Sequence, residues 1–192
     1  MKTFFTSDLH FGHSNIIIYD NRPFSSVDEM DLELIKRWNA KVSNEDTVYV
    51  IGDMFIGINP DYIYNILDSL NGNIVLIKGN HDNFAKKEQY AKYFQAIKDE
   101  DRIEVVLEDG TVHKCILHHQ FFTDFDMEET PILLHGHSHV RPDADAEIAM
   151  IQQLNLDGKD IRAYNVGCMY YNYEPMTLDE IIQGGPKRRS TK

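Results

Sequence analysis

The sequence has few cysteines, little positive charge and no long apolar run. Cys115 and Cys168 are the only two cysteines among 192 residues, and they lie far apart without a C-x-x-C spacing. This scarcity argues against a thiolate zinc site and a disulfide framework, and it predicts a reducing, cytoplasmic location. Apolar runs such as residues 16–19 and 74–77 are much shorter than the roughly 18 residues that a membrane span needs. Asp8 comes too early for a secretory signal, so we expect a soluble protein without a membrane partner.

Positive charge is scarce because 19 Lys and Arg residues stand against 31 Asp and Glu residues, which leaves a net charge of −12. This charge would repel the phosphate backbone of duplex nucleic acid, so a partner of that class is not expected. A small phosphorylated substrate remains possible, because a bound metal ion can reverse the field locally. The one basic run, residues 187–189, belongs to a predicted flexible tail at residues 184–192.

The rest of the chain, residues 1–183, is predicted to form a single domain, since no repeat, low-complexity tract or linker divides it. A capping box begins a helix at Ser26, and Asn59 followed by Pro60 begins another. We also expect a polar helix at residues 84–94 and a final helix after a second capping box at Thr177. Strands are predicted before and between these helices, at residues 2–7, 47–51 and 74–77.

The second half is richer in strands. Residues 102–108 and 111–117 predict a hairpin, with Asp109-Gly110 as a type I′ turn. A short strand follows at residues 132–134, and a second hairpin is expected around Asp157-Gly158, leading into residues 161–166. This order predicts an α/β layered fold, with parallel strands in the first half and hairpins in the second.

The polar residues that carry chemistry follow the predicted strands. In open α/β sheets, ligands bind beyond the carboxyl ends of the strands, so side chains at these ends are expected to meet in one cleft. Within Asp8-Leu9-His10 and His137-Ser138-His139, residues i and i+2 of an extended segment point to the same side and can grip one cation. Carboxylate, imidazole and amide ligands together suit Mn²⁺, Fe or Zn²⁺. Seven of the nine histidines directly follow apolar β runs: His10, His81, His118, His119, His135, His137 and His139.

The ordered set of strand-end motifs resembles the signature of the calcineurin-like metallophosphoesterases. The motifs are Asp8-Leu9-His10, Gly52-Asp53, Gly79-Asn80-His81-Asp82, a strand-end His, and Gly136-His137-Ser138-His139. Residues 11–16 and 22–24 further resemble a subgroup of small, mostly bacterial and phage-type phosphoesterases. The resemblance implies a four-layer α/β/β/α sandwich with two mixed β-sheets, the metallophosphoesterase fold. It also implies two divalent metal ions, with Mn²⁺ expected first and Fe, Zn²⁺ or Ni²⁺ as alternatives.

The resemblance also implies roles for individual residues. Asp8, His10 and His139 would bind one metal, while Asn80, His137 and a histidine after residues 111–117 would bind the other. Asp53 would bridge the two metals, and His81 matches the catalytic histidine of the family. Either His118 or His119 could supply the remaining ligand. We choose His119, because successive strand residues face opposite ways and the pattern of the family puts the ligand second.

The activity implied is hydrolysis of a phosphate ester by a metal-bridging hydroxide, with His81 as the general acid. We expect a small phosphodiester or nucleotide-like substrate; the alternatives are a phosphomonoesterase or a pyrophosphohydrolase. A protein-binding scaffold is a further alternative, which the filled ligand positions disfavour. Arg22 could contact the substrate phosphate through its guanidinium, and His13 could contact the substrate at the rim. The oligomeric state is left open.

Overall fold

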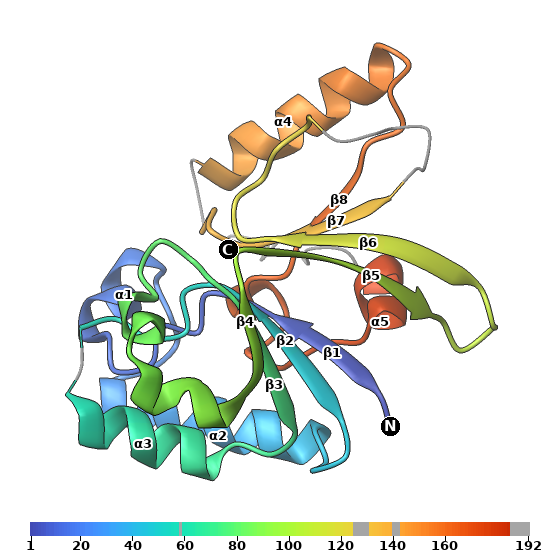
Figure 1. Cartoon of the computed structure of the whole chain (residues 1–192). Helices are drawn as coiled ribbons and strands as arrows, with labels where there is room; N and C mark the ends of the chain where they lie inside the picture. Colours follow the sequence, from blue (N-terminus) through green and yellow to red (C-terminus); the bar gives the residue numbers. More distant parts are fainter. Residues whose placement is uncertain (58, 125–130, 140–142, 185–192) are drawn as a thin grey trace.

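Two four-stranded sheets lie face to face in the computed structural model, which describes residues 1–57, 59–124, 131–139 and 143–184 (Figure 1). The first sheet has the order β1-β2-β3-β4, and all of its neighbouring strands are parallel. The second has the order β5-β6-β7-β8, with β5 antiparallel to β6 and the other pairs parallel. The strands are β1 (Thr3–Thr6), β2 (Thr47–Ile51), β3 (Asn73–Ile77), β4 (Phe94–Lys98), β5 (Glu100–Val106), β6 (Val112–His118), β7 (Ile132–His135) and β8 (Arg162–Asn165).

The second sheet is mixed as expected, whereas the first has only parallel strand pairs, and among the described residues its antiparallel pairing is limited to a bridge between Phe5 of β1 and Met176. Each of the first three strands in the first sheet is followed by a crossover containing helical turns, and such crossovers return the chain parallel to the strand before it. The helices are α1 (Ser14–Tyr19), α2 (Val27–Lys41), α3 (Pro60–Ser69), α4 (Asp143–Leu156) and α5 (Leu178–Gly184), with 3₁₀ segments η1 (Asn83–Lys86), η2 (Glu88–Tyr93) and η4 (Cys168–Tyr170). None of the described helices has the length and apolar character needed to cross a membrane.

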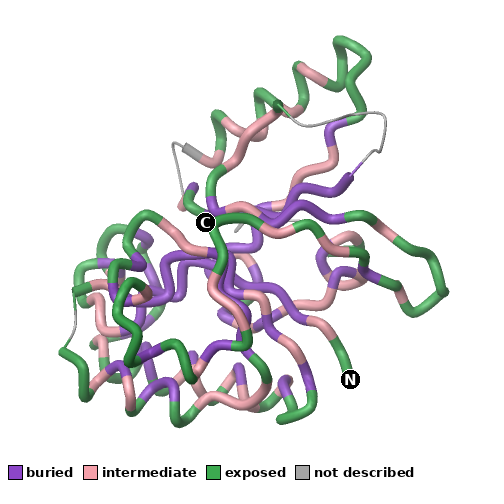
Figure 2. Tube along the Cα trace, in the orientation of Figure 1, coloured by how far each residue is buried: buried purple, intermediate pink, exposed green. Residues whose placement is uncertain are grey.

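Three apolar cores separate the layers, and they establish the predicted α/β/β/α order. The first lies between α2, α3 and the first sheet, where Leu34 and Trp38 meet Val48. The second lies between the two sheets, where Phe5 and Ile51 face strands of the second sheet, with α5 packed at its margin. The third joins α4 to the outer face of the second sheet. Figure 2 shows the buried residues running along both sheets between the outer helices.

The predicted helix starts in the first half are confirmed. The Ser26 side chain accepts a hydrogen bond from the Glu29 backbone N–H at 3.2 Å, which begins α2. The Asn59 side chain accepts from the Tyr62 backbone N–H at 2.9 Å, and Pro60 occupies the first turn of α3. These caps satisfy backbone donors that would otherwise have no partner at the start of each helix.

Residues 84–94 do not form the predicted polar helix. They form two 3₁₀ segments, η1 and η2, and Phe94 begins strand β4 beside β3. The large apolar side chains of this stretch pack into the first core instead, where Phe84, Tyr90 and Phe94 are all buried. Packing of these rings against the sheet overrides the weak helical pattern of the polar residues between them.

The turn around Asp109-Gly110 differs from the type I′ turn that we expected. The backbone N–H of Leu107 donates to Thr111 O at 2.8 Å, which leaves a three-residue loop. Gly110 has a φ of 85°, whereas Asp109 is not among the described residues with positive φ. The hairpin itself is confirmed, because β5 and β6 pair from Glu100 opposite His118 to Val106 opposite Val112.

The second predicted hairpin is wrong, because Asp157-Gly158 ends α4. The backbone N–H of Gly158 donates to Asn155 O and that of Lys159 donates to Leu154 O, at 3.1 and 3.0 Å. These two hydrogen bonds form a Schellman motif, which places a left-handed glycine directly after a helix. Gly158 has a φ of 86°. The predicted tail falls, except for Gly184, on residues 185–192, which lie outside the described residues.

Asp31 of α2 joins three segments of the first layer. Its Oδ2 accepts hydrogen bonds from the Gly12 backbone N–H at 2.8 Å and from the Tyr62 hydroxyl of α3 at 2.7 Å. Its other oxygen, Oδ1, is buried without a hydrogen-bond partner in the described structure. Burial raises the pKa of Asp31 to about 6, although the bonds from Tyr62 and Gly12 act in the opposite direction.

We predict that Asp31→Asn becomes more stabilising, relative to the wild type, as the pH rises. The pKa of Asp31 is 3.8 unfolded and about 6 in the fold, so the fold binds the proton more tightly and loses stability as the pH rises through that interval. The difference in unfolding free energy between variant and wild type should shift by about 1–3 kcal/mol between pH 4 and pH 7. Urea denaturation of metal-free protein at both pH values measures it. A constant difference would contradict the prediction.

Candidate metal centre

The predicted site residues follow strands of both sheets and meet where their carboxyl ends come together. Backbone hydrogen bonds join the loops across the first sheet, from Asp8 N–H to Gly52 O and from His10 N–H to Asp53 O, each at 3.0 Å. One bond pair crosses between the sheets: the His137 N–H donates to the Asp8 carboxylate at 3.0 and 3.2 Å. This edge therefore gathers side chains from positions 8 to 139 of the chain.

Four candidate ligands lie in the left-handed region of backbone conformation. Asp8, His10, Asp53 and His137 have φ values of 55°, 53°, 53° and 69°. Non-glycine residues adopt this region at a cost, and such strain gathers at functional sites, where the surrounding structure holds it. The sharp turns bring the side chains to the ends of the strands, and no local sequence pattern predicts them.

Asp8, His10 and His139 form the first group. Their ligand atoms lie within 4.8 Å of one another. His139 Nε2 is 3.4 Å from Asp8 Oδ1 and 3.2 Å from His10 Nε2. Asp8 and His10 are buried, while the His139 side chain keeps part of its surface exposed.

Asp53, His119 and His137 form the second group, again with ligand atoms within 4.8 Å of one another. Asn80 adjoins it, since its Oδ1 is 3.1 Å from His119 Nε2. Asp53 Oδ2 is 3.4 Å from His119 Nε2 and 3.9 Å from His10 Nε2 of the first group. The Asp53 carboxylate therefore lies between the two groups.

The structure brings His119, rather than His118, to this site. His118 is the last residue of β6, and its ring packs against Phe122 and lies with Nδ1 2.7 Å from Gln120 O. His119 points the other way, and its Nδ1 lies 2.9 Å from Ile51 O. The alternation of side chains along the strand separates the two neighbours.

The ring nitrogens indicate what the two groups can hold. His119 Nδ1 faces the Ile51 carbonyl, so it carries the ring proton and leaves the Nε2 lone pair toward Asp53 and Asn80 oxygens. His139 Nδ1 faces Asp20 at 2.8 Å, which likewise leaves its Nε2 lone pair toward Asp8 and His10. Converging lone pairs and carboxylates repel one another unless a cation or a proton lies among them. The residues therefore fit divalent cations that take mixed oxygen and nitrogen ligands.

The pKa shifts report the same negative field. Burial acts to lower the pKa of His139, but its hydrogen bonds to Asp20 and Asp8 outweigh burial and raise it to about 10. Burial likewise acts to lower the pKa of His119, and the bond to Asp53 with the charge of Asp8 raises it to about 9. At His10, burial outweighs the opposing charge of Asp8 and lowers the pKa to about 3. A positive charge is thus favoured on His119 and on His139, at the positions where cations would bind.

Asp82 holds the exits of β2 and β3 together, a role that sequence reasoning missed. Its carboxylate is buried and accepts hydrogen bonds from the backbone N–H groups of Asp53, Met54 and Gly79, at 2.8, 2.9 and 2.8 Å. His81, next to it, donates its own backbone N–H to Asp53 Oδ1 at 2.9 Å. The Gly-Asn-His-Asp motif therefore binds the Asp53 loop at several points, and it leaves the His81 side chain about half exposed (49%).

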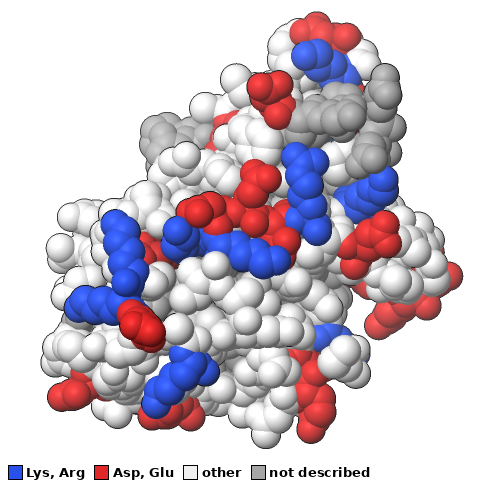
Figure 3. Space-filling model, in the orientation of Figure 1, with Lys and Arg blue, Asp and Glu red and all other residues white. Residues whose placement is uncertain are grey.

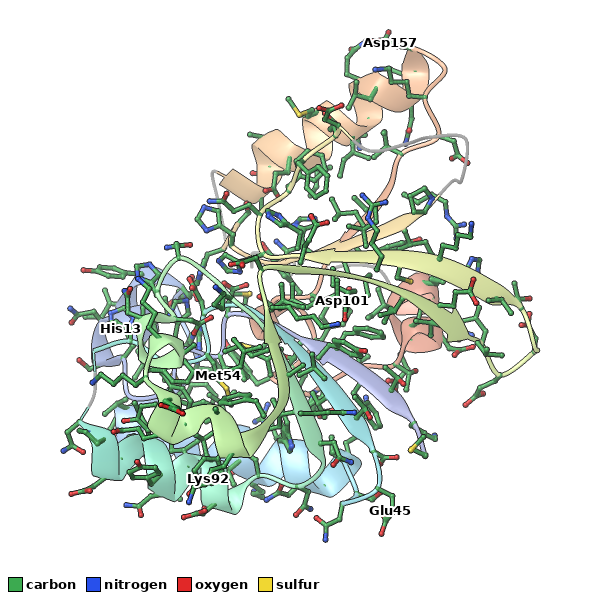
Figure 4. The ribbon with its side chains drawn as sticks, viewed as in Figure 1. His13, Glu45, Met54, Lys92, Asp101 and Asp157 are labelled. Carbon is green, nitrogen blue, oxygen red and sulfur yellow. The ribbon has the colours of Figure 1, made fainter. Side chains whose placement is uncertain are left out.

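Arg22 does not lie where the predicted phosphate contact requires it. Its side chain is fully enclosed (0% exposed) and donates to Asp20 and to the backbone carbonyls of Asp8 and Leu9. Its guanidinium is thus occupied beneath the site, and this position corrects the expectation of a substrate contact. His13, labelled in Figure 4, is partly exposed, and its ring lies 5.7 Å from that of His10; the substrate contact stays a prediction.

Comparison with known proteins agrees with these motifs. The calcineurin-like phosphoesterase superfamily domain matches residues 1–172. The uncharacterized protein MJ1445 of Methanocaldococcus jannaschii is 34% identical over 183 residues, covering 95% of this chain and 90% of that protein. The Gene 66 protein of Mycobacterium phage L5 is 31% identical over 161 residues, covering 72% and 77% of the two chains. A solved structure, the protein of unknown function AQ665 from Aquifex aeolicus, shares the fold with a TM-score of 0.66 at 22% identity, covering 94% of this chain and 97% of that one.

The family domain supports a metal-dependent phosphoesterase in general, and the two clusters of Asp and His side chains fit that class. The chain belongs to the calcineurin-like phosphoesterase superfamily, as the family match and the archaeal relative show. The resemblance carried by the strand-end motifs is thereby confirmed. Membership supports a hydrolase that acts on phosphate esters.

Gly79 is required by the close approach of Asp53. A Cβ atom at Gly79 would lie 2.2 Å from Asp53 Oδ1 and 2.5 Å from the Asp53 backbone nitrogen. We predict that Gly79→Ala destabilises the fold by about 1–3 kcal/mol, the usual cost of overpacking. Gly184→Ala is the matched control, because nothing lies within 4 Å of a Cβ there, and its effect should stay within about 1 kcal/mol. Equal unfolding free energies for Gly79→Ala and wild type in urea titrations would contradict the prediction.

Proposed function

We propose that this protein is a binuclear, metal-dependent phosphoesterase that hydrolyses small phosphodiesters or nucleotide-like substrates. The observation that carries the proposal is the Asp53 carboxylate between two histidine-rich groups, with Oδ2 within 3.9 Å of a ring nitrogen from each. A carboxylate so placed suits the bridging ligand of a metal pair. Members of this family usually use divalent metals, which supports the same interpretation.

The ligand sets follow from the two groups. Asp8, His10 and His139 would hold one cation and His119, His137 and Asn80 the other, with Asp53 shared. When bound, such cations supply Lewis-acid stabilisation of the phosphoryl oxygens and an activated water for in-line attack. We propose Mn²⁺, with Fe, Zn²⁺ or Ni²⁺ as alternatives, because the ligands mix carboxylate, amide and imidazole without thiolate.

The position of His81 supports its proposed role as the general acid. Its Nε2 lies 4.0 Å from Asp53 Oδ2, and its ring centroid is 6.0 Å from that of His10. The half-exposed side chain can therefore reach a substrate bound over the Asp53 carboxylate. Its backbone N–H bond to Asp53 keeps the residue in register with the bridging ligand. A proton donated from the ring to the departing oxygen would complete cleavage of the ester.

The substrate is proposed to be small. On the face shown in Figure 3, Lys and Arg side chains are interspersed with acidic ones among the described residues, and the net charge is −12. Such a surface does not favour a polyanion such as duplex nucleic acid. His13 is proposed as a substrate contact at the rim, where its ring adjoins that of His10. We also propose a cytoplasmic location, which suits two free, buried cysteines.

A substrate panel tests the proposed activity. Mn²⁺-loaded protein should hydrolyse a chromogenic phosphodiester faster than a phosphomonoester or a pyrophosphate-linked compound. A panel of cyclic, linear and terminal nucleotides should then identify the preferred substrate. Asp53→Asn should lose bound metal and at least about 100-fold in activity, since both groups share this carboxylate. Asp46→Asn is the matched control, because Asp46 is also buried but binds Lys2 and Ser43 backbone N–H groups instead.

Failure of the protein to hydrolyse any of these compounds while Mn²⁺ is bound would contradict the proposed function. A clear preference for monoesters would instead favour the phosphomonoesterase alternative.

We predict that His81→Ala lowers kcat by about 10²- to 10⁴-fold while bound metal stays at the wild-type level. The side chain donates a proton without serving as a ligand, so its loss should slow the chemical step and leave the metal in place. Steady-state kinetics and metal analysis of the purified variant measure both quantities. His113→Ala, on the β5–β6 hairpin, is the control and should retain activity. A fully active His81→Ala protein would remove the proposed role.

A further inference from the structure

Arg22 lies behind the first group of candidate ligands. Its Nη1 donates to Leu9 O at 2.9 Å and its Nη2 donates to Asp8 O at 2.8 Å. Its Nε and Nη2 also donate to Asp20 Oδ2, at 3.1 and 3.0 Å. One side chain therefore contacts the backbone that carries Asp8 and leads to His10, and it also contacts the carboxylate behind His139.

Asp20 is the link between this guanidinium and the first group. Both of its carboxylate oxygens lie 2.8 Å from His139 Nδ1. Asp20 and Arg22 are almost fully buried, at 5% and 4% exposed. The Arg22 guanidinium thus contacts the Asp20 carboxylate, which contacts the His139 imidazole, whose Nε2 faces the other ligand atoms of the first group.

Burial of the Arg22–Asp20 ion pair costs free energy. Removing two opposite charges from water is expensive, and an apolar pair of similar volume is often no less stable. Substrate cannot use either group, because their polar atoms are occupied within the protein. The ion pair therefore suggests a task that apolar packing could not perform.

We propose that Arg22 and Asp20 are positioning residues for the metal held by Asp8, His10 and His139, an inference that rests on the metal site of the proposed function. Asp20 accepts the Nδ1 proton of His139, which selects the tautomer whose Nε2 lone pair points to the metal position. A carboxylate on the outer nitrogen also makes an imidazole a stronger ligand. Arg22 holds Asp20 in place through two donors.

The fork of the guanidinium explains the choice of arginine. Asp8 and His10 both have left-handed backbone, and the carbonyls of Asp8 and Leu9 lie within that strained stretch. Arg22 donates to both carbonyls and to Asp20 at the same time. These bonds require several donors in one rigid plane. A lysine carries the same charge on a single nitrogen and cannot reproduce this arrangement.

Two conservative substitutions test the proposal by metal affinity, measured without substrate. Asp20→Asn keeps the shape but removes the charge behind His139, and Arg22→Lys keeps the charge but removes the fork. Each should weaken Mn²⁺ binding by about 10- to 100-fold in isothermal titration calorimetry. In Zn²⁺-loaded, ¹⁵N-histidine-labelled protein, the Nδ1–H resonance of His139 should be protected in the wild type, and in Asp20→Asn it should shift and exchange faster.

Matched controls come from elsewhere in the chain. Arg37 also lies against the Tyr173 ring, 5.9 Å from its centroid compared with 5.7 Å for Arg22, but it binds Glu33 and the Asn172 carbonyl. Arg37→Lys should therefore leave Mn²⁺ affinity unchanged. Asp46→Asn serves the same purpose for a buried carboxylate.

Wild-type Mn²⁺ affinity in Asp20→Asn or in Arg22→Lys would overturn the role of that residue. If neither variant folds in chelator, as judged by cooperative urea unfolding, the pair serves folding and the proposal is wrong. A wild-type protein that binds Mn²⁺ but cleaves no phosphate ester would refute the proposed activity. The Mn²⁺ affinities of the two variants would still decide whether Asp20 and Arg22 are positioning residues. A wild-type protein that binds no divalent cation would refute both.

Discussion

Electrostatic repulsion at the shared edge of two sheets is the constraint on which this structure depends. Carboxylate oxygens and imidazole lone pairs converge there at 3.2 to 3.9 Å, contributed by loops that only the tertiary fold brings together. Isolated from the rest of the protein, these groups would separate or take up protons. The surrounding structure must therefore hold them in place until positive charge is bound.

That support is built in layers. Three apolar cores fix the sheets and helices, and on this frame the exits of β2 and β3 are tied by the buried carboxylate of Asp82. The His137 N–H reaches across from the second sheet to the Asp8 carboxylate. The left-handed backbone at Asp8, His10, Asp53 and His137 lies within this hydrogen-bonded region, where the His10 N–H also donates to Asp53 O. Stability stored in the cores thus offsets strain at the edge.

Much of this arrangement could be predicted because its signals are local. Polar residues after apolar β runs indicated which side chains would meet, and alternation along the strand separated His119 from His118. Asp20 and Arg22 gave no such signal, since nothing in a loop sequence tells a buried guanidinium from a solvated one. Strand β4 could not be predicted because its apolar residues are spaced among polar ones. Helix α4 could not be predicted because the hydrophobic pattern of its residues is weak, and Gly158 was its one clear signal. In each case the deciding information is burial, which exists only after the layers assemble.

The connection between the sheets has a mechanical consequence. β4 ends at Lys98 and β5 begins at Glu100, so only Asp99 separates the last strand of one sheet from the first strand of the other. This crossing lies at the carboxyl end of β4, next to the exit of β3, since the Lys78 N–H donates to Lys98 O at 2.8 Å. One residue spans no more than roughly 4 Å, so at this edge the sheets can slide past one another very little. Relative motion of the two sheets is therefore restricted at the end of the strands where the candidate ligands lie.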